Sequence, residues 1–332
     1  MKRVSWIDNA KAIAIFLVVL GHYAGLNSHV KTVIYSFHLP LFMIISGLLL
    51  KDNFYQIRFS LFFNKQLRSF ISLYVFFSIV SILFWFLIND LSTQHVITAI
   101  KAMVYGTHGA DKLYLHDNGA LWYFPFLITS LLLFYCVMQT GTWGALILSS
   151  VYFFVSYYYS GLRLPWSLDV AGVGVLSLLI GFYFKNISQT VLLQLNRNKN
   201  ALLLLMGVTS IAFITLSSVN GITNINKNLF GESIVFYLVN ILLGSFLIFC
   251  LSIYIPKNKL SEFISNNTLV IFAIHLLLVK LLRFLTEINN TLLKHFLIFC
   301  SAVLITLICA VLGRFLMPWI KRNIMFNPKI KE

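Results

Sequence analysis

The residues best suited to chemistry lie within segments that are otherwise apolar. Lys11 and His22 stand eleven residues apart in the first such segment, and this spacing places both side chains on one face of an α-helix, about 16 Å apart along its axis. An ionisable side chain inside a membrane helix is costly and marks a functional site by default. His22 is either a general base, because burial disfavours imidazolium, or a packed and hydrogen-bonded histidine. Lys11 is either a cation of the site or a membrane anchor.

A second histidine begins the next apolar segment. If both segments cross a membrane, they run in opposite directions. His22 and His38 should then lie at similar depth, near the outer face of that membrane. Pro40 removes a backbone hydrogen bond and can kink the helix there. A kink beside a polar residue is a common way to open a cavity. His38 therefore either faces such a cavity or closes the kink with a hydrogen bond.

Later segments add further polar and aromatic residues. Those at predicted outer ends are Asp117, Asn118, Trp122, Trp166 and Asp169. Tryptophans in this position either anchor the chain at the interface or line a site, and Asp169 either caps a helix or orients a base. His275 lies near the middle of a later segment, as a packed histidine or a site residue. Asp8 is a candidate helix N-cap, and about 20 Å of helix separates it from His22, too far to orient that imidazole.

A pair of cations precedes the third apolar segment. Lys65 and Arg68 are three residues apart and share a helical face. With Lys11 they could form a pocket for a polyanion. A phosphate held at about 4 Å by one such cation gains up to ~4 kcal/mol at an effective dielectric of about 20, before desolvation. The alternative is ordinary positive charge on the cytoplasmic side of a membrane.

The composition is that of a membrane protein. Of the 332 residues, 59% are hydrophobic and 11% charged, and the mean hydropathy is +0.86. Soluble domains carry about 25% charged residues, so this chain could not cover a surface exposed to water, whereas a surface facing lipid should be apolar. Topology explains the net charge of +15, because nucleic-acid binding needs a basic face on a folded soluble domain, and the sequence contains none.

The apolar segments predict an all-α, polytopic membrane protein with about ten transmembrane helices, forming one membrane-embedded domain over residues 1–332. Most of the 25 lysines and arginines lie in segments that are cytoplasmic if the N-terminus is inside, so both termini are predicted to be cytoplasmic. An amphipathic helix over 91–105 is expected along the outer surface. The first segment has no small-residue cleavage site, which favours a membrane helix over a signal peptide. The expected spans are 10–26, 33–50, 70–88, 120–138, 143–159, 168–184, 200–219, 232–255, 268–285 and 296–320.

The cysteines and one glycine pair predict packing rather than chemistry. The four cysteines fall inside apolar segments without metal-ligand spacing, so we expect neither a disulfide framework nor a metal site. Gly172 and Gly174 lie within a predicted span and do not follow a strand, which favours close helix packing over a dinucleotide-binding loop.

Taken in order, these motifs resemble the acyltransferase-3 family of bacterial membrane acyltransferases, with the fucose 4-O-acetylase-like branch as the closest variety. Lys11 and His22 match the family's signature of a basic residue, ten further residues and histidine, and Lys65-Gln66-Leu67-Arg68 resembles its basic pair. Lysine stands where many members have arginine, so the bidentate geometry of arginine is lost. We expect no attached soluble domain of the kind that some members carry, so the membrane part would have to recognise the acceptor. Other matching segments are Arg3–Asp8, Phe37–Phe42 with Ser46-Gly47, Ala120–Phe124, Leu164–Trp166 with Asp169, and Asn267–Leu269 with His275.

The resemblance implies transfer of an acyl group, usually acetyl, from acyl-CoA to a hydroxyl of a cell-surface carbohydrate such as O-antigen, capsule or another exopolysaccharide. His22 would be the catalytic base, a role that typically contributes about 10²–10⁴ in rate, and an acyl-histidine intermediate is an alternative. The residues expected to hold acetyl-CoA at the inner face are Lys11, Lys65 and Arg68. The candidates for the acceptor site, or for orienting the base, are His38, Asp169 and Trp122.

The same resemblance implies a set of partners and a location. Acetyl-CoA would be a co-substrate rather than a tightly bound cofactor, and the other partners would be the carbohydrate acceptor and membrane lipids, without nucleic acid or metal. The location would be the cytoplasmic (inner) membrane of a bacterium. The main alternative is a transporter or flippase of lipid-linked saccharide, which predicts paired halves with broken helices in matching positions. The sequence shows no two-fold repeat, and acetyl-CoA binding would separate the two functions.

Overall fold

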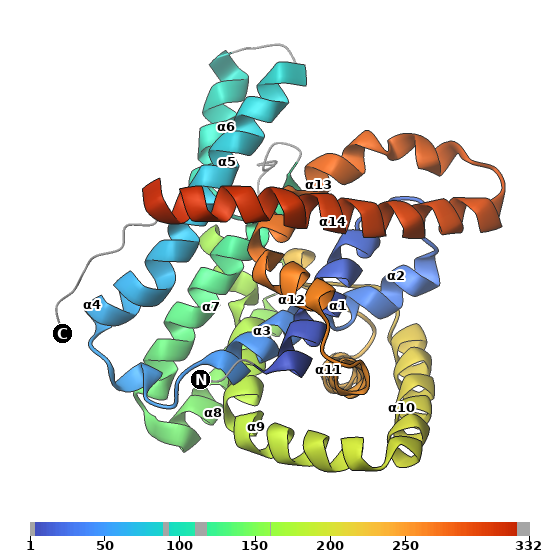
Figure 1. Cartoon of the computed structure of the whole chain (residues 1–332). Helices are drawn as coiled ribbons and strands as arrows, with labels where there is room; N and C mark the ends of the chain where they lie inside the picture. Colours follow the sequence, from blue (N-terminus) through green and yellow to red (C-terminus); the bar gives the residue numbers. More distant parts are fainter. Residues whose placement is uncertain (1–3, 89–92, 110–117, 160, 324–332) are drawn as a thin grey trace.

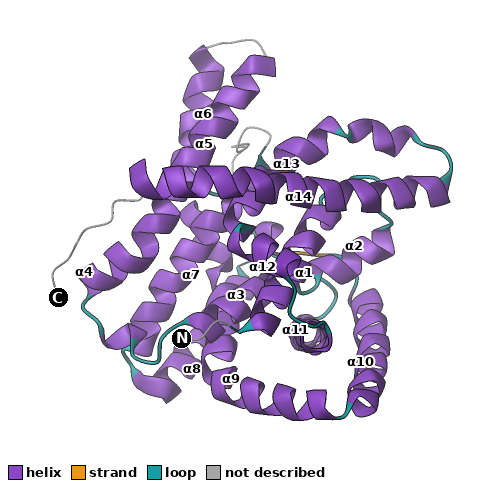
Figure 2. Ribbon diagram, viewed as in Figure 1, coloured by secondary structure: helices purple, strands orange, loops and turns teal. Residues whose placement is uncertain are grey.

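The computed structural model describes residues 4–88, 93–109, 118–159 and 161–323, and these form a helical chain with one short hairpin (Figures 1 and 2). The α-helices are α1 Ser5–Gly21, α2 Ser28–Tyr35, α3 His38–Leu49, α4 Phe59–Phe62, α5 Arg68–Ile88, α6 Thr93–Tyr105, α7 Tyr123–Met138, α8 Gly141–Tyr158, α9 Ala171–Arg197, α10 Lys199–Asn220, α11 Ile234–Tyr254, α12 Lys259–Asn266, α13 Thr268–Leu281 and α14 Thr291–Asn323. The 3-10 segments are η1 Phe54–Gln56, η3 Gly119–Trp122, η4 Pro165–Val170, η5 Ile225–Lys227 and η6 Arg283–Glu287, while η2 Phe63–Leu67 is a π turn. Strands β1 Thr223–Asn224 and β2 Leu229–Phe230 pair antiparallel.

The prediction of a multi-pass helical membrane protein is confirmed. Within the described residues, seven helical segments are long and apolar enough to cross a membrane, or eight if the bent pair α12–α13 is one span. The two other predicted spans correspond to α1, which has 17 residues, and to α8, where serines and tyrosines interrupt the apolar run. The count of ten stays a prediction. So does the cytoplasmic placement of the termini, whose residues 1–3 and 324–332 lie outside the described ranges.

The first helix is central to the packing. α1 contacts α3, α11, α12, α13 and α14, and polar side chains anchor its N-terminal end. Asn9 donates to the carbonyls of Ser252 and Ile255, at 2.9 and 3.0 Å, which satisfies groups at the end of α11. Asp8 accepts a 2.7 Å hydrogen bond from the Ser265 hydroxyl. The N-cap role considered for Asp8 is wrong, because it lies in the first turn of α1 and joins this helix to α12 instead.

Two helix breaks shape the region around α1. α2 and α3 form one apolar segment that is interrupted just before His38, as expected where Pro40 prevents a continuous helix. α12 and α13 meet at 79°. At that corner the Asn267 amide donates to the Phe263 carbonyl at 2.8 Å and satisfies a backbone group that the break exposes.

Small residues allow close helix packing elsewhere. α3 packs on α9, where a Cβ added to Gly181 would overlap the backbone of Ile44. A Cβ added to Gly172 would lie 2.8 Å from the Phe153 Cα of α8, and one on Gly174 would overlap Ser130 of α7. The predicted packing role of the Gly172 and Gly174 pair is confirmed.

The helix expected over 91–105 is present as α6, and Figure 1 shows α5 and α6 projecting together from the other helices. The same view shows α9 and α10 curving around α11, which is seen along its axis. α14 runs in front of several other helices in Figure 1, and it contacts α1 and α13. The helices packed on α1 therefore include α3, α13 and α14, which carry residues of the site described below.

Candidate active site

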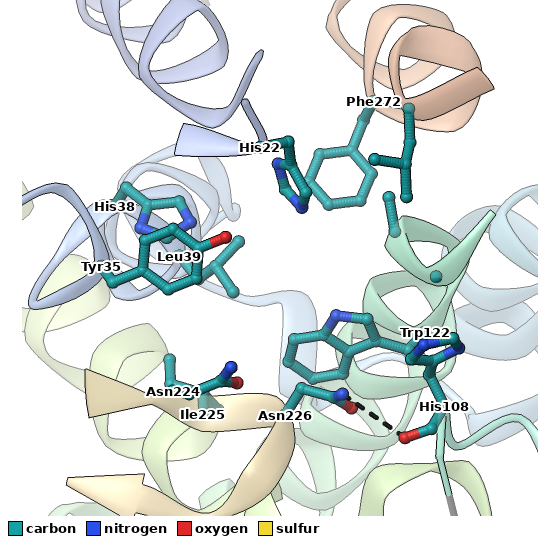
Figure 3. A pocket seen from close by; sticks show the side chains of 13 residues that line it. His22, Tyr35, His38, Leu39, His108, Trp122, Asn224, Ile225, Asn226 and Phe272 are labelled. Carbon is teal, nitrogen blue, oxygen red and sulfur yellow. Dashed lines mark hydrogen bonds between the residues drawn. The ribbon is translucent and has the colours of Figure 1, made fainter. Parts of the chain in front are cut away.

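Two cavities lie at opposite ends of α1. The first, which we call the histidine cavity, has a volume of about 190 Å³ and lies where α1 ends. Figure 3 shows its residues arranged around an open space, with His22 facing His38 and Tyr35 on one side and Trp122 on another. The structure therefore brings together three residues that the sequence singled out. Its lining residues are His22, Tyr35, His38, Leu39, His108, Gly119, Ala120, Trp122, Asn224, Ile225, Asn226, Phe272 and Leu276.

The imidazole of His22 is held through one ring nitrogen. Its Nδ1 lies 2.7 Å from the Val18 carbonyl oxygen, which can only accept a hydrogen bond, so we assign the ring hydrogen to Nδ1. In the neutral ring this leaves Nε2 unprotonated. His22 therefore has the tautomer that a general base requires, and it lines the cavity.

A second histidine supports this tautomer from α13. His275 is fully buried, and its Nδ1 lies 3.0 Å from the carbonyl oxygens of both Ile271 and Phe272, so this nitrogen carries the hydrogen. The Nε2 of His275 is then an acceptor, and it lies 3.3 Å from Nδ1 of His22. His22 thus directs its single N–H toward two acceptors. The sequence had suggested His38 or Asp169 for orienting the base, whereas His275 is the residue in contact with it.

His38 occupies the break between α2 and α3. Its Nδ1 lies 2.7 Å from the Ile34 carbonyl oxygen, a group near the end of α2, so His38 closes the break as one of the two alternatives expected. It also lines the cavity, with its ring centroid 5.1 Å from that of Tyr35. Both alternatives for His38 therefore apply, since Nδ1 bonds the backbone and Nε2 remains as an acceptor for a ligand.

Trp122 reaches the cavity from η3, and the residue just before η3, Asn118, anchors this segment. The fully buried Asn118 donates to the Ser81 hydroxyl at 2.8 Å and to the Ala273 carbonyl at 2.7 Å, joining η3 to α5 and α13. Trp122 is 7% exposed, so it is a wall of the cavity and not an interfacial anchor. Asp117 lies outside the described residues.

The β-hairpin supplies residues that the sequence analysis did not identify. Asn224 and Asn226 line the side of the cavity opposite the histidines (Figure 3). The side chain of Asn224 accepts a hydrogen bond from the Lys227 backbone N–H, so its NH₂ group can donate to a ligand. The Asn226 amide instead donates to the His108 carbonyl at 3.4 Å. The sequence feature that could have identified these residues was the alternation of asparagines in a loop between two apolar segments.

Asp169 lies apart from both cavities. It belongs to η4, where its carboxylate lies 3.4 Å from the Arg163 guanidinium. It does not cap α9, whose N-cap is Val170. Trp166 and Ser167 in this segment have positive φ angles of 56° and 55°, which strains residues with side chains. This part of the family-like motif therefore forms a tightly held turn rather than a wall of the histidine cavity.

The second cavity, which we call the lysine cavity, lies at the other end of α1. It has a volume of about 510 Å³, and Lys11, Lys65 and Lys321 all line it, together with Gln66. Lys321 comes from the end of α14 and was missed, because the sequence indicated only ordinary positive charge near a terminus. Its other lining residues are Ile15, Phe42, Ile45, Ser46, Leu49, Leu50, Ser69, Phe70, Leu73, Tyr123, Leu127, Leu131, Ser265, Asn266, Thr268, Leu269, Phe272 and Met317.

Arg68 does not line the lysine cavity, although it is only three residues from Lys65. Lys65 lies within the π turn η2, and Arg68 begins α5. Successive residues rotate less in a π turn than in an α-helix, so three positions no longer return to the same face. Arg68 is not part of the lining and its guanidinium lies 3.4 Å from the Asn64 side-chain oxygen.

The fold and its two cavities define a multi-pass membrane protein with histidines around one cavity, near the end of α1, and a cluster of lysines around the other. A family model described as an acyltransferase domain, that of the acyltransferase-3 family, matches residues 4–314. The chain therefore belongs to the acyltransferase-3 family and is a membrane acyltransferase. No match to a curated protein or to a solved structure was found.

Proposed function

We propose that this protein is an O-acetyltransferase of the bacterial cytoplasmic membrane, which moves acetyl from acetyl-CoA to a hydroxyl of a cell-surface carbohydrate such as O-antigen, capsule or another exopolysaccharide. The observation that carries the proposal is the tautomer of His22. Because its Nδ1 hydrogen is directed to Val18 and His275, Nε2 is the proton acceptor in the histidine cavity. The fucose 4-O-acetylase-like branch remains the variety that we favour.

The lysine cavity supports acetyl-CoA as the donor. Lys11, Lys65 and Lys321 approach it from three separate helical segments, an arrangement suited to a ligand with several phosphates. Each ammonium acts as a point charge, without the bidentate geometry of arginine. Arg68 would add its positive charge from beside this cavity. With both termini in the cytoplasm and about ten spans, these lysines would face the compartment in which acetyl-CoA is made.

The histidine cavity supports a carbohydrate acceptor. It joins an aromatic wall, Trp122, to hydrogen-bonding groups at His38 and Asn224, and pockets of this kind combine apolar surface with a few placed polar groups. None of its lining residues is Asp, Glu, Lys or Arg among the residues that the structure describes. An uncharged, hydroxyl-rich acceptor fits this chemistry better than an ionic one.

In the proposed reaction, Nε2 of His22 removes the proton of the acceptor hydroxyl as its oxygen attacks the thioester carbonyl carbon. The carbon–sulfur bond then breaks, and the CoA thiolate takes the proton from the His22 imidazolium. His275 keeps the imidazole oriented throughout, since it bonds the ring nitrogen that does not react. Such a base typically contributes about 10²–10⁴ in rate.

The test is transfer of radiolabelled acetyl from acetyl-CoA to cell-envelope carbohydrate. We expect label with the unmodified protein and loss of about 10²-fold or more for His22→Ala at equal membrane levels. His29→Ala is the matched control, because His29 is exposed on α2. Equal labelling by His22→Ala would remove His22 as the base. Absence of label with the unmodified protein, in membranes that contain the native acceptor, would instead favour the transport of lipid-linked saccharide.

A further inference from the structure

A single aromatic side chain lies between the two cavities. Within the described ranges of the chain, Phe272 alone lines both the histidine cavity and the lysine cavity. It is 5% exposed and comes from the N-terminal half of α13. The ring therefore separates the space that holds His22 from the space that holds the lysines.

The neighbouring residues show the same division. On α13, Leu269 lines the lysine cavity and Leu276 lines the histidine cavity, about one helical turn to either side of Phe272. On the facing segment, Tyr123 lines the lysine cavity, whereas Trp122 lines the histidine cavity. The two cavities therefore follow one path along α13, and Phe272 is the point at which one ends and the other begins.

The Phe272 ring is held firmly in this position. Its centroid lies 4.5 Å from that of Tyr123 and 5.8 Å from that of His275, and Phe124 packs edge-on to it at 6.2 Å. Its own carbonyl accepts a hydrogen bond from His275. The residue that divides the cavities is therefore also bonded to the residue that orients the base.

This arrangement limits what a donor can carry. If the phosphates of acyl-CoA bind at the lysines, the acyl end must reach toward His22, and the path to His22 meets the ring of Phe272. The carbonyl carbon has to come within reach of the base, so every carbon beyond it needs room at this ring. An acetyl group adds one methyl, whereas each longer chain adds methylenes that must also fit beside this ring, which packs against Tyr123 and Phe124.

We propose that Phe272 determines the acyl length of the donor, by narrowing the passage from the lysine cavity toward His22 so that acetyl is accepted and longer acyl groups are excluded. This inference rests on the proposed function, because it takes acyl-CoA as the ligand of the lysine cavity. It assigns to Phe272 a role in specificity that is separate from the base chemistry of His22.

The test is competition binding, which needs no acceptor. Radiolabelled acetyl-CoA is bound to the purified full-length protein in lipid nanodiscs and displaced by unlabelled acetyl-CoA, butyryl-CoA or hexanoyl-CoA. Burial of one methylene contributes about 0.8 kcal/mol, or about fourfold in affinity. For Phe272→Ala we expect the affinity for butyryl-CoA relative to acetyl-CoA to rise about tenfold or more above that of the unmodified protein.

Two further variants keep this test decisive. Phe124→Ala removes a buried aromatic ring beside Phe272 that lines neither cavity, and its affinity ratio should match that of the unmodified protein. Phe272→Leu, a smaller change, should shift the ratio in the same direction if Phe272→Ala does not fold. An unchanged ratio in a folded Phe272 variant, or an equal shift in Phe124→Ala, would overturn the inference. Absence of acetyl-CoA binding to the unmodified protein would instead overturn the proposed function.

Discussion

The Nε2 atom of His275 lies 3.3 Å from the Nδ1 atom of His22. The two histidines come from α13 and α1, and they are 253 positions apart in the chain. Because the Nδ1 of His275 is bonded to two carbonyl groups of its own helix, its Nε2 can only accept. The contact therefore leaves Nε2 of His22 as the nitrogen that can accept a proton, and under the proposed function it makes His275 a positioning residue.

This relationship predicts the behaviour of His275 variants. His275→Phe fills the site without offering an acceptor, and we expect kcat to fall about 10²-fold, since a misplaced catalytic group typically costs that much. His275→Gln retains a side-chain acceptor and should recover a measurable part of this loss. The KM for acetyl-CoA should not change in either variant, because His275 lies outside the lysine cavity. Steady-state acetyl transfer measures both constants, and equal activity of the Phe and Gln variants would show that the role is packing alone.

The lysine cavity predicts a ranking of cation substitutions. We expect Lys321→Gln and Lys65→Gln to weaken acetyl-CoA binding about tenfold each, well below the ~4 kcal/mol limit for a cation and a phosphate at an effective dielectric of about 20. Arg68→Gln should have a smaller effect, because Arg68 does not line the cavity. Binding of radiolabelled acetyl-CoA at several salt concentrations provides the measurement, and the affinity should fall as salt rises. Arg322→Gln is the matched control on α14, and a loss as large as that of Lys321→Gln would refute a local contact.

The histidine cavity predicts variants that affect only the acceptor. Trp122→Ala and Asn224→Ala should each raise the concentration of envelope carbohydrate needed for half-maximal transfer, by about 2–10-fold, as expected for loss of a neutral hydrogen bond or an aromatic contact. The KM for acetyl-CoA should stay constant. The control is Trp143→Ala on α8, a tryptophan that is 78% exposed and lines neither cavity. A rise in the KM for both substrates would indicate a general loss of structure instead.

Much of the site was predictable because its parts lie on single helices. The spacing of Lys11 and His22 gives their common helix face, and the position of Pro40 indicates the break at which His38 turns inward. Membrane burial makes each such polar residue conspicuous. These inferences need only local geometry and the cost of placing an ionisable group in lipid.

The remaining parts depend on contacts between distant segments. Nothing in the local sequence pairs His275 with His22, since their contact joins two helices that are far apart in the chain, and α13 follows a 79° bend. The end of α14 that carries Lys321 returns to α1 from the far end of the chain, and a π turn moves Arg68 away from Lys65. A helical wheel assumes a regular α-helix, so it could not foresee that separation.

The packing of α3 on α9 predicts a stability effect at a glycine remote from both cavities. In Gly181→Ala the new Cβ would overlap the Ile44 backbone, which cannot move without shifting α3. Overpacking of this kind typically costs about 1–3 kcal/mol, so we expect a lower midpoint of thermal unfolding in detergent. Gly207→Ala on α10 meets nothing within 4 Å, and it should be neutral or stabilise by up to about 1 kcal/mol, because alanine favours the helix. Equal midpoints for the two variants would contradict the close approach of α3 and α9. A displaced α3 also moves His38, so Gly181→Ala should lower acetyl transfer at temperatures where Gly207→Ala remains fully active.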